Sequence, residues 1–176
     1  CFNNVRQNFY EKIDEAVHAA TYDGEHKLSY AEPEYTGKFM DICAYYYETE
    51  KDVRALKKGM AVVDSIEKNI RADGYLGCLG NGNELKVFSV WNQAFTLYGL
   101  TRMYEATEDM RILALVQRAA DWIVNTFSGK NAPDILEAFN KGSQHITCFH
   151  SMCRAYAVTG DRKYLDFIKS ALDYCE

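Results

Sequence analysis

The sequence lacks the features that mark several large classes of protein. It has no excess of positive charge, because 20 Lys and Arg stand against 25 Asp and Glu, and its pI is near 5.4. Such a chain offers no obvious surface for nucleic acid. No apolar run approaches the roughly 20 residues of a membrane span. No phosphate loop, Ser/His/Asp order or redox Cys-x-x-Cys is present, so these chemistries have no signature here.

The composition is that of a globular protein. Of 176 residues, 48% are hydrophobic and 26% charged, which predicts one domain over residues 1–176 with a sizeable core. The chain begins with Cys1 and shows no signal peptide, so we expect a processed form or a piece of a longer protein; its compartment stays open. Cys43, Cys148 and Cys153 lie on apolar helical faces, which predicts reduced thiols that behave as small hydrophobes.

A ten-residue phrase occurs three times. It reads YETEKDVRAL from Tyr47, YEATEDMRIL from Tyr104 and YAVTGDRKYL from Tyr156, at spacings of 57 and 52 residues. The positions that agree are Asp52, Asp109 and Asp161, then Leu56, Leu113 and Leu165, then Asp64, Asp121 and Asp173. Repetition at such a period indicates a stacked supersecondary unit.

Each unit is predicted to be a hairpin of two helices, over residues 36–70, 88–128 and 145–175. The stretch before each phrase is apolar almost all round, which is typical of a buried inner helix. The stretch after it has one apolar stripe, such as Ile112, Val116, Ala119, Ala120, Ile123 and Phe127, which is typical of an outer helix. The first Asp of each phrase is placed to cap the outer helix, and the Tyr and Leu to pack across the corner.

A further helix over residues 3–20 would bring the count to seven helices and no sheet. The remaining connections are long, at 21–37, 71–87 and 128–144, and rich in glycine. This topology puts the short corners at one end and the long loops at the other. Long loops in a compact domain are usually functional, so we expect the site at the long-loop end.

At ADGYLG (Ala72–Gly77) the chain resembles a known group of enzymes. It is similar to the α/α-toroid (six-hairpin) glycosidases, and most closely to the β-L-arabinofuranosidase-like family. The shared motifs are Asp73–Leu76, Trp91, Thr159-Gly160-Asp161 and Tyr164-Leu165, and the similarity covers about residues 36–176. The resemblance implies an all-α fold of antiparallel hairpins, with about three of six toroid hairpins in this chain.

The chain departs from the family pattern in three places. Ala94 and Phe95 stand where the family usually has a His, and Gln144–Cys148 replaces its Glu and Gly-Gly-Met step. The family's catalytic thiolate and zinc-binding cysteines lie further toward the C-terminus, and no matching cysteine pair exists here. The resemblance therefore does not carry the zinc-thiolate mechanism to this chain, and we predict neither metal nor cofactor.

The candidate site residues come from the long-loop end. Asp73 and His145 are the catalytic candidates; the substrate-binding candidates are Tyr75, Trp91, Asn92, His150 and Asp41. Each has a plain structural alternative. Asp-Gly is ordinary turn chemistry, Asp41 suits the first turn of a helix, and a histidine on an inner helix can be a partnered core residue. His145-x-x-Cys148-x-His150-x-x-Cys153 has metal-ligand types, but its spacing divides them between two helix faces.

The sequence therefore predicts a glycoside hydrolase that acts on a poly- or oligosaccharide. One alternative is a toroid sugar epimerase or polysaccharide lyase, in which His145 or His150 transfers a proton. The other is a helical-repeat scaffold that binds protein. The apolar inner helices also predict self-association or pairing with a missing half-toroid.

Overall fold

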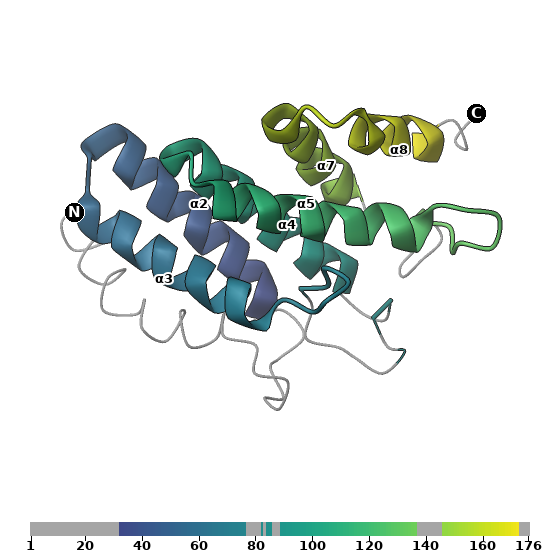
Figure 1. Ribbon diagram of the computed structural model, residues 1–176, viewed down its shortest axis with the longest axis horizontal. Coiled ribbons are helices and arrows are strands. Elements are labelled where there is room, and N and C mark those ends of the chain that lie inside the picture. Colours follow the sequence, from purple (N-terminus) through teal and green to yellow (C-terminus); the bar gives the residue numbers. More distant parts are fainter. Residues whose placement is uncertain (1–31, 77–81, 83, 86–88, 137–145, 173–176) are drawn as a thin grey trace.

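The structure is a computed structural model that describes residues 32–76, 82, 84–85, 89–136 and 146–172 (Figure 1). These residues form six α-helices and no strand, which confirms the all-α prediction; residues 3–20 lie outside them. The helices are α2 (Glu32–Glu50), α3 (Val53–Asn69), α4 (Ser89–Thr107), α5 (Met110–Phe127), α7 (Ile146–Thr159) and α8 (Arg162–Leu172). In this described part, none of the helices combines the length and apolarity that a bilayer crossing demands.

The helices form three consecutive hairpins, α2/α3, α4/α5 and α7/α8. Helix α4 is central and packs against α2 on one side and α7 on the other, while α3, α5 and α8 form an outer layer. In Figure 1 the corners of the first two hairpins lie together on the left, and the connection that follows α5 lies on the right. The predicted separation of short corners from long loops is therefore seen in these two hairpins.

The repeated phrase is the corner between an inner and an outer helix. In each corner one residue has a left-handed backbone, and its N–H donates to the carbonyl of the repeated Tyr. These residues are Lys51 (φ 53°, N to O 3.0 Å), Glu108 (φ 55°, 2.7 Å) and Gly160 (φ 71°, 2.8 Å). The next residue is the repeated Asp, whose carboxylate accepts a backbone N–H two residues on, at Arg54, Arg111 and Lys163. The predicted caps are confirmed.

The core residue of each corner is not the predicted leucine. Leu56, Leu113 and Leu165 are only half-buried, whereas the residue before each is fully buried; these are Ala55, Ile112 and Tyr164. One residue along a helix turns the side chain by about 100°, so the neighbouring position faces the inner helix instead.

The last repeated aspartate joins neighbouring hairpins. Asp64 on α3 reaches Arg111 on α5 at 3.5 Å, and Asp121 on α5 contacts Lys163 on α8 at 2.8 Å. In both cases the cation lies two residues after the capping Asp of the next hairpin. Asp121 also accepts a hydrogen bond from the Tyr164 hydroxyl at 2.9 Å. The repeat thus encodes contacts between hairpins as well as the corner inside each one.

Helix α2 begins at Glu32, earlier than the predicted 36. Pro33 is tolerated there because the N–H groups of a first helical turn have no partner within the helix. Gly37, predicted to end a loop, lies inside α2 where it crosses α4. A Cβ at Gly37 would stand 1.8 Å from the Phe95 carbonyl oxygen, and one at Gly99 2.7 Å from the Gly37 Cα. Two glycines therefore let these helices touch backbone to backbone.

Candidate functional site

The glycine-rich loop after α3 is held by ion pairs. Arg71 contacts both carboxylate oxygens of Asp73, at 2.8 and 2.6 Å, and also Glu84 at 2.6 Å. Asp73 Oδ1 further accepts the Tyr75 N–H at 3.2 Å, which closes the turn. The hydrogen bonds from Arg71 hold the pKa of Asp73 and of Glu84 below their ordinary values. A general acid must keep its proton near neutral pH, so this arrangement does not suit Asp73 as a general acid, and its catalytic role stays a prediction.

Two predicted binding residues lie in the core instead. Tyr75 is 4% exposed, its ring centroid is 4.9 Å from that of Trp122, and the Arg71 guanidinium covers it at 4.6 Å. Asn92 is 1% exposed. Neither side chain is open to a sugar, because the loop folds onto α5 and α4 turns Asn92 inward. Trp122, on the outer helix, is a buried packing residue.

A partly exposed aromatic surface lies instead on the inner helices. Trp91, Phe95, Tyr98, Arg102 and Glu105 follow one another at helical spacing on α4, so they share one face. The Trp91 and Phe95 ring centroids are 5.0 Å apart. We call this surface the central face, and it includes the side chains of α2 and α7 that contact these residues.

Helices α2 and α7 complete the central face with polar groups. The Lys38 ammonium lies 4.8 Å from the Phe95 ring centroid and 5.9 Å from that of Tyr35. On the other side, the exposed ring of His150 stands 5.2 Å from the ring of Tyr98. Tyr35 and Tyr45 on α2 are also exposed, at 61% and 57%. The N-terminal half of this face thus combines aromatic rings with a lysine and a histidine.

The C-terminal half of the central face is a network of ion pairs. Arg102 on α4 contacts Asp41 at 2.9 Å and Glu48 at 2.6 Å on α2, and Glu105 at 2.5 Å. Arg154 on α7 also binds Glu105. Asp41 is therefore in the middle of α2 and bound to an arginine, not in a solvated first turn as predicted. Burial and the nearby Asp41 carboxylate raise the pKa of Tyr98.

The sequence matches the family described as β-L-arabinofuranosidase, GH127 catalytic domain, over residues 2–174. The chain belongs to this family. Two solved structures resemble it. One is a GH127 β-arabinofuranosidase, with a TM-score of 0.70 and 19% identity over 98% of this chain and 29% of that chain. The other is a GH127 β-L-arabinofuranosidase from Geobacillus stearothermophilus T6, with a TM-score of 0.73 and 19% identity over 92% and 26%.

The identity and coverage values limit what the relationship to GH127 supports. The identity to the solved structures is low, so that likeness establishes the shared fold. This GH127 chain spans between a quarter and a third of the length of either structure. No curated protein matches the sequence. The family assignment confirms the resemblance drawn from the DGYL loop, Trp91 and the repeated corners.

The described cysteines of this GH127 chain do not fit a zinc-thiolate centre. Cys43 and Cys148 are fully buried in the core, and burial raises the pKa of each thiol to about 12. Cys153 is exposed, contrary to the apolar face predicted for it. Among residues 32–76, 82, 84–85, 89–136 and 146–172, no three His, Cys, Asp or Glu side chains are grouped as metal ligands. His145 lies outside the described residues.

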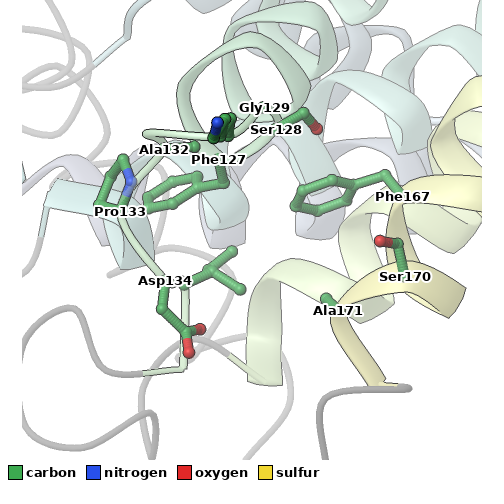
Figure 2. Close-up of a pocket in the computed structure, with 11 residues that line it drawn as sticks. Phe127, Ser128, Gly129, Ala132, Pro133, Asp134, Phe167, Ser170 and Ala171 are labelled. Carbon is green, nitrogen blue, oxygen red and sulfur yellow. The ribbon is translucent and has the colours of Figure 1, made fainter.

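A hollow of about 350 Å³ opens in the outer layer (Figure 2). Phe127 lines it from the end of α5, Pro133 and Ile135 from the connection after α5, and Phe167 and Ala171 from α8. Among the residues that the structure describes, none of those that line it belongs to an inner helix. It is therefore separate from the central face.

Sequence reasoning missed Lys38, Phe95 and Tyr98. A signal was available for the two aromatic residues, because they continue from Trp91 at steps of four and three residues. Lys38 had no such signal, since its position over Phe95 depends on the close crossing of α2 and α4.

Proposed function

We propose that this chain forms one wall of the saccharide cleft of a glycoside hydrolase that acts on β-linked arabinofuranosides. The observation that carries the proposal is the N-terminal half of the central face, where Trp91, Phe95, Lys38 and His150 lie together. The GH127 family assignment supports the substrate class, because the related structures are β-arabinofuranosidases.

The chemistry of this surface suits a sugar. Aromatic rings pack against the apolar face of a sugar ring, while hydroxyl groups need hydrogen-bond partners at its edge. Trp91 offers both: within the described residues, its buried Nε1–H has no hydrogen-bond acceptor. A buried donor without a partner is costly, so a rearrangement that uncovers this N–H for a sugar oxygen would be favoured. The Lys38 ammonium and the His150 imidazole supply further donors.

The acid and base of hydrolysis are not assigned to this face. Its described carboxylates, Asp41, Glu48 and Glu105, are all bound to Arg102, and Glu105 also to Arg154. We therefore propose a binding role for this wall. The ion-pair network occupies the C-terminal half of the central face, which leaves the aromatic N-terminal half, near the long loops, for the substrate.

The test is made in the polypeptide that contains this chain, with a p-nitrophenyl β-L-arabinofuranoside as substrate. Trp91→Ala should lower kcat/KM at least tenfold, which corresponds to about 1.4 kcal/mol, because both ring and N–H are lost. Trp91→Phe keeps a ring and should lose less. Met110→Ala is the control, since this exposed residue lies at the corner end, on the outer helix. Unchanged kcat/KM in Trp91→Ala would refute the role of this wall.

A further inference from the structure

The segment from Arg71 to Leu76 is wedged between two helices. Its turn is closed by the Gly74 N–H, which donates to the Arg71 carbonyl at 2.9 Å, and by the Arg71 N–H, which donates to the Tyr75 carbonyl at 3.2 Å. Gly74 has a φ of +95°, and a Cβ there would stand 2.0 Å from the Arg118 carbonyl oxygen. The loop backbone therefore lies directly on α5, at a distance that only glycine permits.

A single buried amide fastens this segment to both helices. Gln93 on α4 is fully buried, and its Oε1 accepts the Leu76 N–H at 2.7 Å. Its Nε2 donates to the carbonyl oxygens of Gly74 and of Ala119 on α5, both at 3.0 Å. The orientation of the amide is fixed by its partners, because a flipped group would set its NH₂ against an N–H and its oxygen against two carbonyls.

We propose that Gln93 is a positioning residue for the saccharide site, an inference that rests on the proposed function. Gln93 stands two residues after Trp91, so the two side chains leave α4 on nearly opposite sides. Gln93 faces the loop and α5, whereas Trp91 belongs to the central face. One turn of helix thus connects the Gly74–Leu76 backbone to the aromatic surface, and Gln93 sets the distance between them.

A buried amide at this position indicates that one arrangement of the loop, α4 and α5 is selected over others. An apolar side chain of the same size would avoid burying an amide, but it would leave the Leu76 N–H without its acceptor. A fully satisfied buried amide, in contrast, allows one arrangement of its partners, because any shift leaves a buried group unpaired. Gln93 ties together three segments at once, the loop, α4 and α5. It therefore holds the long-loop end of α4 in one register.

The experiment compares Gln93→Met with Ser151→Ala in the polypeptide that contains this chain. Gln93→Met keeps the length of the side chain and removes all three hydrogen bonds. Ser151 is a matched control, since it is also fully buried and donates to a backbone carbonyl of α4, at Ala94 and 2.7 Å, but makes no hydrogen bond to the loop among the residues that the structure describes. The readouts are amide hydrogen exchange at Leu76 by NMR, and KM and kcat for a p-nitrophenyl β-L-arabinofuranoside.

In Gln93→Met we expect exchange at Leu76 to rise at least tenfold, and KM to rise about tenfold with kcat within twofold. Ser151→Ala should leave both Leu76 exchange and KM unchanged. Gly74→Ala is a second route to the same displacement, because the added Cβ pushes the loop off α5. It should raise KM in the same way, and it keeps the inference testable if Gln93→Met does not fold.

Two results would overturn the positioning role. Leu76 exchange that stays at the wild-type rate would show that Gln93 does not hold the loop. Faster exchange with an unchanged KM would show that Gln93 is a loop anchor with no influence on the site. Failure of the proposed function is distinguishable, because in that case either the wild-type protein would not hydrolyse the substrate or Trp91→Ala would leave kcat/KM unchanged, whatever the exchange at Leu76.

Discussion

Glu108→Gly should stabilise this protein, although glycine usually weakens a helical protein. Glu108 follows the last residue of α4 and has a φ of +55°. Its side chain is exposed, and the equivalent residue of the third corner is already glycine, Gly160 with φ +71°. The left-handed backbone is required there because the Glu108 N–H must reach the Tyr104 carbonyl while Asp109 begins the cap of α5.

The magnitude follows from two opposing effects. A residue with a Cβ loses about 1–2 kcal/mol in the left-handed region. Glycine avoids that strain, but it has more freedom to lose on folding, which costs about 0.5–1 kcal/mol. The difference predicts a gain of about 0.5–1 kcal/mol for Glu108→Gly. By the same reasoning Gly160→Ala should lose about 1 kcal/mol.

Urea denaturation measures both changes as a shift of the midpoint concentration, while the dependence of the unfolding free energy on urea (the m-value) should stay constant. Ala114→Gly is the control, because this exposed residue lies inside α5 with ordinary helical geometry and should lose about 1 kcal/mol. If Glu108→Gly destabilised the protein as much as Ala114→Gly does, the corner would not have the backbone described and the shared explanation of the three phrases would fall.

Three further outcomes are expected. Ile112→Ala should cost about 2–5 kcal/mol and Leu113→Ala clearly less, because Ile112 is fully buried and Leu113 is not; equal losses in urea titrations would contradict this register. Asp109→Asn should keep the cap but make the free energy of unfolding depend less on pH under acidic conditions. Hydrogen bonds from Arg111 lower the pKa of Asp109 below its ordinary 3.8. The stabilisation by this carboxylate is therefore present above about pH 4, and it is lost as the pH falls through the lowered pKa of the folded state. If the stability of the Asn variant fell with decreasing pH as steeply as that of the wild-type protein, this assignment would be wrong. Gly37→Ala should cost about 3 kcal/mol or more, because α2 and α4 must separate. A loss under about 1 kcal/mol in the same titration would mean that the two helices are not in backbone contact at Gly37.

The local features of this protein were determined by the sequence. The corners at 50–53, 107–110 and 159–162 follow from aspartates that cap the helix they begin, and both partners of each bond lie within a few residues. The outer helices could be oriented for a similar reason. Each has one apolar stripe, and a helix with one stripe can bury itself in only one way.

The central face was decided by the tertiary structure. The inner helices are apolar almost all round, so their sequences do not say which side meets a neighbour and which side faces outward. Asp41 and Arg102 are 61 residues apart, and they pair only because Gly37 and Gly99 let α2 and α4 approach closely. The same crossing brings Lys38 over Phe95, while the wedged loop carries Tyr75 into the core instead of the site. Contacts of this kind depend on the distances between helix axes, which no local pattern of residues contains.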